Sequence, residues 1–136
     1  NRSIKKTFTI KSNLKEIDPL VNDILSCLKD ANVNNEILYD VKLVTQEALI
    51  NAVKHGNKLN PQMFVAVDFD YSNDTIKITV QDEGKGYDYA NIPDPTLEEN
   101  IIKGCGRGVF LIRKLMDEVN FNKAGNRIEM IKRISH

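Results

Sequence analysis

Glu47 and Asn51 stand four residues apart in the segment EALINAVKHGN, so in a helix their side chains lie one turn apart. They lie at the edge of an apolar arc at helical spacing, formed by Ile37, Val41, Val44, Ala48 and Ala52. A carboxylate and a carboxamide at this spacing can share one Mg²⁺ shell, and the carboxylate can also accept a proton from a hydroxyl or a water. Taken alone, such a pair is more typical of a half-exposed helix flank.

Asp82 continues a row of apolar side chains that alternate along a predicted strand: Ile76, Ile78 and Val80. A buried carboxylate is costly unless it is paired, so Asp82 is expected either to lie in water past the strand end or to bind a ligand. The exocyclic amine of adenine is a suitable donor. Gly84 and Gly86 would let the backbone approach a flat ring closely, although an ordinary turn after a strand has a similar composition.

The segment GCGRGVFLI places glycines 104, 106 and 108 at the start of a predicted helix. Exposed backbone amides and the positive end of the helix dipole favour phosphate at such a position. The guanidinium of Arg107 can reach phosphate oxygens. A glycine-rich helix start is a weak signal by itself, but the three motifs together supply a metal and base site, an adenine site and a phosphate site.

The hydrophobic periodicity predicts three helices and five strands around these motifs. The expected order is a strand at 4–11, a helix from a cap at Ser12 or Asn13 to about 31, a helix at 35–54, strands at 63–71 and 75–82, a helix at 107–116, and strands at 118–123 and 127–134. The two hairpins indicate a mixed, mainly antiparallel sheet. Helices on one face of it would make an α/β (α+β) two-layer sandwich. The long connection at 83–108, rich in Gly, Pro, Asp and Asn, is expected to be functional or disordered.

The composition narrows the classes of partner and compartment. The 136 residues include 19 Lys and Arg and 19 Asp and Glu, so no strong net charge favours nucleic acid or an anionic membrane. No apolar run is long enough to span a membrane. Cys27 and Cys105 do not form a metal-type cluster, and with no export signal the simplest expectation is reduced thiols in the cytoplasm.

In this order, the three motifs resemble the histidine-kinase-like ATPase domain of the GHKL superfamily, which has the Bergerat ATP-binding fold. EALINAVKHGN is similar to the N box, and DEGKG to the first glycine box, D-x-G-x-G. GRGVFLIRKLMDEVNF, followed by GNRIEMIKR, resembles the second glycine box and the end of the domain. PDPTLEEN and GRGVFLIRKLMDEV are most similar to bacterial anti-sigma factor serine/threonine kinases. The resemblance implies one ATPase domain over residues 1–136, with an ATP lid at about 87–105.

The resemblance also implies a role for each residue of the motifs. Asp82 is similar to the residue that recognises the adenine amine, and Asn51 to the Mg²⁺ ligand. Glu47 resembles the general base that activates the acceptor. Gly84 and Gly86 resemble the glycines that shape the pocket beside the base. The positions that resemble the phosphate contacts are Gly104, Gly106, Arg107 and Gly108.

By this resemblance, the chain is expected to be an ATP- and Mg²⁺-dependent protein serine/threonine kinase that also inhibits a sigma factor. Its substrate would be a STAS-type anti-sigma factor antagonist, and the protein would act in transcription regulation. The resemblance also allows the protein to form a homodimer. Two alternatives stay open: a nucleotide-gated module that binds a partner without phosphoryl transfer, and the ATPase domain of a larger regulator. A structural domain without a ligand would leave Asp82, both glycine clusters and the long loop unexplained.

Overall fold

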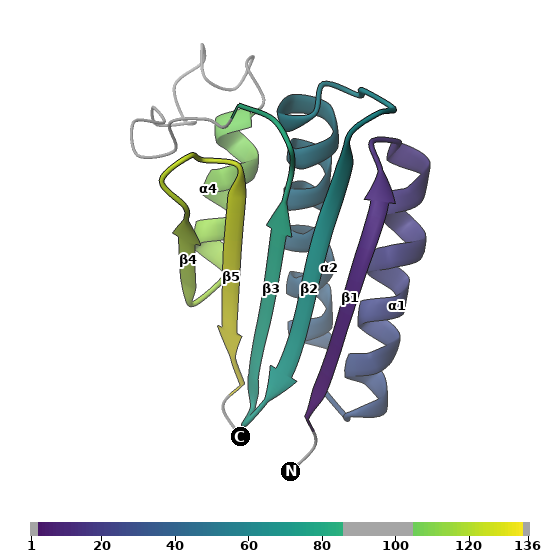
Figure 1. Cartoon of the computed structure of the whole chain (residues 1–136). Helices are drawn as coiled ribbons and strands as arrows, with labels where there is room; N and C mark the ends of the chain where they lie inside the picture. Colours follow the sequence, from purple (N-terminus) through teal and green to yellow (C-terminus); the bar gives the residue numbers. More distant parts are fainter. Residues whose placement is uncertain (1–2, 86–104, 135–136) are drawn as a thin grey trace.

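The computed structural model describes residues 3–85 and 105–134, and this part of the chain contains five strands and three α-helices (Figure 1). The strands are β1 (Ile4–Lys11), β2 (Phe64–Ser72), β3 (Thr75–Gln81), β4 (Glu118–Phe121) and β5 (Arg127–Arg133). The α-helices are α1 (Ile17–Asp30), α2 (Asn35–Ile50) and α4 (Cys105–Leu115). A 3₁₀ turn (Leu14–Glu16) precedes α1, and a π-helical segment (Asn51–Gly56) follows α2 directly.

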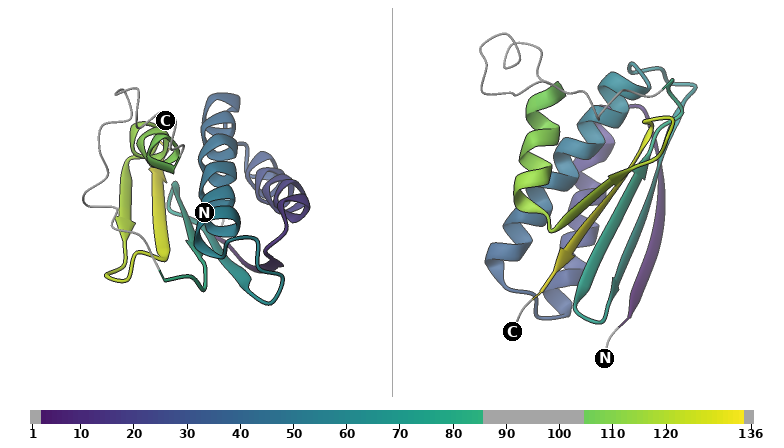
Figure 2. Two further views of the ribbon diagram at one scale, coloured as in Figure 1. Left: turned by 90° about the horizontal axis from the view of Figure 1, so that it is seen from above. Right: turned by 90° about the vertical axis from the view of Figure 1, so that its left-hand side faces the viewer.

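The five strands form one sheet in the order β1-β2-β3-β5-β4. Every ladder among the described strands is antiparallel, so the expected mixed sheet is antiparallel throughout that part of the chain. The three helices lie on one face of the sheet (Figures 1 and 2), which confirms the two-layer α+β architecture. Among the described residues, no helix has both the length and the apolar composition that a membrane span requires.

The core lies between the sheet and the helices. Alternate residues of β2 and β3 are buried there: Val65, Val67, Phe69, Tyr71, Ile76, Ile78 and Val80. The helices bury residues three or four apart, as expected for amphipathic helices: Ile17, Leu20, Val21, Ile24 and Leu28 in α1, and Leu38, Val41, Val44, Ala48 and Leu49 in α2. Burying one such side chain contributes about 1.5–3 kcal/mol. One expectation differs, because Ile37 is only half-buried and Leu38 takes its place in the core.

Both predicted hairpin turns are present. Asn73 and Asp74 connect β2 to β3 with φ angles of 51° and 58°, which is the left-handed pair that a two-residue hairpin turn requires. Between β4 and β5, the side-chain oxygen of Asn122 accepts hydrogen bonds from the backbone amides of Gly125, Asn126 and Arg127. This second turn holds Asn126 at the edge of the site described below.

The alternating direction of successive elements brings the predicted motifs to one end of the molecule. α2 runs towards the end at which β3 finishes, and α4 starts at the same end (Figure 1). The turn between β4 and β5 closes there too, beside the end of β3. The four segments that carry the candidate residues are therefore neighbours, although they are far apart in the sequence.

The second predicted helix departs from its expected form. The sequence pattern indicates one helix over 35–54, but the chain changes from α- to π-helix at Asn51. The Asn57 amide then donates to the Ala52 carbonyl and the Leu59 amide to the Val53 carbonyl, so the hydrogen bonds span five and six residues. Apolar spacing does not distinguish these two helices over so short a segment. π-Helical segments of this kind are frequent at functional sites.

The structure also bears on the two ends of the long connection predicted between β3 and the last helix. α4 begins at Cys105, slightly before the predicted start at 107. Apart from Cys105, the expected lid at about 87–105 lies outside the described residues, and it remains a prediction from the resemblance.

Candidate functional site

Asp82 follows β3 directly and is buried, with 8% of its surface exposed. Its backbone amide donates to the Asn126 carbonyl at 2.9 Å, so the chain stays paired with the β4–β5 turn beyond the strand. Burial raises the pKa of the Asp82 carboxyl, and the Gly84 amide, which donates to Oδ1 at 2.7 Å, opposes that rise. Among the described residues, Gly84 is the only hydrogen-bond donor to this carboxylate. The carboxylate therefore keeps acceptor capacity for a ligand.

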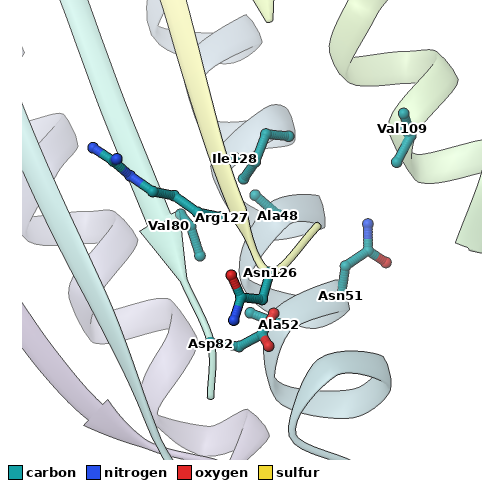
Figure 3. Close-up of a pocket in the computed structure, with 9 residues that line it drawn as sticks. All are labelled: Ala48, Asn51, Ala52, Val80, Asp82, Val109, Asn126, Arg127 and Ile128. Carbon is teal, nitrogen blue, oxygen red and sulfur yellow. The ribbon is translucent and has the colours of Figure 1, made fainter. Parts of the chain in front are cut away.

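A pocket opens beside Asp82, between α2, the end of β3, the first turns of α4 and the β4–β5 turn (Figure 3). It is lined by Ala48, Asn51, Ala52, Val80, Asp82, Val109, Asn126, Arg127 and Ile128. Its volume is ≈ 10 Å³, about the space that one water molecule needs. Because this volume is smaller than a nucleotide base, a base at Asp82 would lie across the open side of the pocket, or the residues that line the pocket would have to move apart.

Two glycines bring the π-helical segment into contact with the turn after β3. A Cβ atom on Gly56 would lie 2.4 Å from the carboxyl carbon of Asp82, and one on Gly84 would lie 2.1 Å from the Gly56 carbonyl oxygen. Neither distance is compatible with a side chain at these positions. Glycine at position 84 therefore permits the close approach of the two backbones, and glycine at position 56 leaves room for the Asp82 carboxylate.

Glu47 and Asn51 meet the start of α4 at Gly108. A Cβ atom on Gly108 would lie 2.7 Å from Glu47 Oε2 and 3.2 Å from Asn51 Nδ2, so both side chains reach the helix backbone where that residue has no side chain. The positive end of the α4 dipole favours a carboxylate there. Asn51 also lines the pocket with Asp82 (Figure 3). The structure thus joins the helix pair, the strand-end carboxylate and part of the glycine-rich helix start.

The other predicted contacts are less well defined. Gly106 and Arg107 belong to the first turn of α4. Gly86 and Gly104 lie outside the described residues. The phosphate contacts expected of Gly104, Gly106 and Arg107, and the contact expected of Gly86 beside the adenine, remain predictions.

Sequence reasoning did not assign a role to two asparagines of the site. Asn57 is 1% exposed, and its Oδ1 accepts a hydrogen bond from the Glu83 amide at 2.8 Å. Asn126 lines the pocket, and its Nδ2 donates to the Gly84 carbonyl at 3.3 Å. These bonds join residues 26 and 42 positions apart, so no local pattern reveals them. The position of Asn57 inside the N-box-like segment was the only available signal.

Comparison with known proteins agrees with this geometry. Residues 10–132 match the family model of the histidine kinase-like ATPase domain. The chain belongs to this family. The serine-protein kinase RsbW of Staphylococcus epidermidis is 36% identical to it, over 76% of the chain and 70% of the relative. RsbW of Staphylococcus aureus (strain JH9) shows the same identity and coverage. The resemblance inferred from the three motifs is therefore confirmed.

For a histidine kinase-like ATPase domain the expected ligand is ATP, and the chemistry of the site suits an adenine nucleotide. Asp82 offers a buried carboxylate oxygen to an amine donor, and Gly56 and Gly84 shape the backbone around it. Glu47 and Asn51 offer the oxygen ligands that Mg²⁺ prefers. Within the described residues, no group of three or more His, Cys, Asp or Glu side chains could hold a metal ion.

Proposed function

We propose that this protein is an ATP- and Mg²⁺-dependent protein serine/threonine kinase and an anti-sigma factor of a partner-switching system. The observation that carries the proposal is the contact of Glu47 and Asn51 with Gly108, beside the pocket that Asp82 lines. This contact supports the proposal because the proposed base, Glu47, and the proposed metal ligand, Asn51, then lie near the proposed adenine site. The relatives named serine-protein kinases, at 36% identity, support the same activity.

In this proposal each motif holds a different part of the nucleotide. Asp82 accepts a hydrogen bond from the adenine amine, and Asn51 binds the Mg²⁺ ion, which offsets the negative charge of the phosphates. Gly84 and Gly86 lie beside the base. The residues that contact the phosphates are Gly104, Gly106, Arg107 and Gly108. The backbone amides at the start of α4 suit the phosphates because they point out of the positive end of the helix.

Glu47 is the proposed general base. It takes the proton from a serine or threonine hydroxyl of the substrate while the hydroxyl oxygen forms its bond to the γ-phosphorus of ATP. The bond from that phosphorus to the β–γ bridging oxygen breaks, and ADP leaves. Glu47 is half-buried in α2, and its carboxylate lies at Gly108 near the start of α4, where the phosphates are proposed to bind.

The proposed protein partners are a sigma factor and a STAS-domain anti-sigma factor antagonist, the latter being the phosphoryl acceptor. The balance of 19 basic and 19 acidic residues fits partners that are proteins better than nucleic acid. Such partners place the reaction in the cytoplasm.

The test compares Glu47→Gln with the unmodified protein. The amide keeps the shape of the side chain but cannot accept the proton, so ATP should still bind while phosphoryl transfer falls roughly 10²–10⁴-fold. The assay follows labelled γ-phosphate onto a STAS partner encoded by the same organism. Glu36→Gln is the matched control, because Glu36 is exposed in the first turn of the same helix, and it should leave transfer unchanged.

Two results would contradict the kinase. If the unmodified protein binds the STAS partner in the presence of ATP but never labels it, the protein is a nucleotide-gated binding module. If Glu47→Gln transfers phosphate as fast as the parent, Glu47 is not the base.

A further inference from the structure

The turn that follows β3 is held from two sides by asparagines of different elements. On one side, the Asp82 amide donates to the Asn126 carbonyl, and Asn126 Nδ2 donates to the Gly84 carbonyl. On the other side, the Glu83 amide donates to Asn57 Oδ1 at 2.8 Å. The Gly84 amide closes the turn onto Asp82 itself. The orientation of the Asp82 carboxylate therefore depends on groups that do not belong to its own strand.

Asn57 uses both donors of its side-chain amide, and its oxygen accepts one hydrogen bond. The two hydrogens of Nδ2 go to Ser12 Oγ at 2.9 Å and to the Phe64 carbonyl at 3.0 Å. The Ser12 hydroxyl gives its own hydrogen to the Met63 carbonyl, so towards Asn57 it acts as an acceptor. A flipped amide, or an aspartate, would put an oxygen against these acceptors. Only the observed orientation presents Oδ1 to Glu83.

The position of Asn57 in the chain links this network to the rest of the site. Asn57 follows Gly56, the residue whose backbone lies against the Asp82 carboxylate, and its own amide closes the π-helical segment by donating to Ala52. A shift of Asn57 would therefore move both the wall that Gly56 forms and the turn that carries Asp82. Asn57 is therefore connected both to the backbone beside the Asp82 carboxylate and to the turn that carries Asp82, which a side chain that only fills the core would not require.

We propose that Asn57 is a positioning residue for nucleotide recognition: it holds the turn after β3 so that Asp82 faces the adenine amine. The inference rests on the proposed adenine site. It predicts that losing Asn57 harms discrimination between bases, because guanine carries a carbonyl where adenine carries the amine that Asp82 accepts. A purely structural role would lower stability and leave that discrimination intact.

The experiment measures dissociation constants for ATP and GTP in folded protein, well below the midpoint of thermal unfolding. For Asn57→Ala we expect ATP binding to weaken about tenfold with little change for GTP, since one fixed hydrogen bond is lost. Asn57→Ser is used if the alanine variant does not fold, because its uncharged hydroxyl is too short to replace Oδ1 as the acceptor for the Glu83 amide. Ser12→Ala is the matched control, because it removes a buried partner of Asn57 but leaves the bond to Glu83. Its ratio of ATP to GTP affinity should stay within about twofold of the parent.

Two outcomes would overturn the inference: an unchanged ratio in a folded Asn57 variant, or an equal fall of the ratio in Ser12→Ala. Asp82→Asn in the same assay separates this inference from the proposed function. If Asp82→Asn leaves the ratio unchanged, the adenine site itself is wrong. If Asp82→Asn abolishes the preference for ATP but the Asn57 variants keep it, Asp82 reads the base and Asn57 only supports the fold.

Discussion

The carboxylate of Asp82 is placed where folding and ligand binding make opposite demands. Burial raises its pKa, so the folded protein binds a proton at this group more readily than the unfolded chain does. The free energy of unfolding should therefore fall as the pH rises from the ordinary aspartate range through the folded-state pKa, and the loss persists at higher pH. A ligand that donates a hydrogen bond to the carboxylate would offset this cost.

Asp82→Asn should accordingly stabilise the free protein at pH 7 and weaken its binding of ATP. The gain in stability should shrink as the pH falls into the ordinary aspartate range, where the parent carboxyl also becomes neutral. ATP affinity should fall roughly ten- to hundredfold, as for the loss of a charged hydrogen-bond partner. Urea unfolding at pH 7 and pH 4, and titration with a fluorescent ATP analogue, measure the two effects. Asp68→Asn, on an exposed position of β2, is the control that should change neither.

Gly108 permits a second test at the scale of one residue. In Gly108→Ala the new methyl group would meet Glu47 Oε2, and the end of that side chain can rotate away at little cost to the fold. Stability should change by less than about 1 kcal/mol, because alanine also favours the helix. Phosphoryl transfer should fall at least about tenfold, since a misplaced base is inefficient. Full transfer activity in this variant would show that the contact between Glu47 and α4 has no catalytic consequence.

Among the elements, the π-helical segment decides how the end of α2 meets the sheet. It ends at Gly56 and is followed by the buried Asn57. Two left-handed residues, Lys58 and Leu59, then turn the chain towards β2. Leu59 has a φ angle of 58° and is 48% exposed. A left-handed conformation costs a residue with a Cβ atom about 1–2 kcal/mol.

Leu59→Gly should therefore raise the free energy of unfolding by about 0.5–1 kcal/mol, after the greater flexibility of glycine in the unfolded chain is included. Leu14→Gly is the matched control, because Leu14 has nearly the same exposure, 46%, and lies in the 3₁₀ turn before α1 without a positive φ angle. That variant should lose stability. Denaturant unfolding measures the stability of both variants. If the two variants lose the same free energy of unfolding, the contacts of the Leu59 side chain outweigh its backbone strain.

For the whole molecule, ligand binding should appear as thermal stabilisation. ATP with Mg²⁺ at a hundred times its dissociation constant should add about 2.7 kcal/mol, which for a domain of this size raises Tm by roughly 10 °C. In Asn51→Ala the part of the shift that depends on Mg²⁺ should disappear, and the shift measured with ATP and a chelator should remain. Calorimetry with and without chelator tests this. Equal losses under both conditions would give Asn51 a structural role only.

Much of this protein could be predicted from its sequence, because the relevant patterns are local. The alternation of Ile76, Ile78 and Val80 predicted the strand, and the structure confirms it. The same pattern left open whether Asp82 lies in water past the strand end or faces a ligand, and the structure shows that it is buried. The turn residues Asn73 and Asp74 predicted the hairpin, since few residues adopt left-handed backbone easily. The three motifs were specific enough together to indicate the family, which the match over residues 10–132 shows.

Only the tertiary structure decided how the motifs meet. The change to a π-helix at Asn51, the contact of Gly56 with Asp82 and the bond from Glu83 to Asn57 leave no periodic trace in the sequence. Secondary structure follows from side-chain spacing along a few turns or strand residues. These contacts instead depend on the relative placement of a helix end, a strand end and a hairpin, and that placement is set by the packing of the whole core between the sheet and its helices.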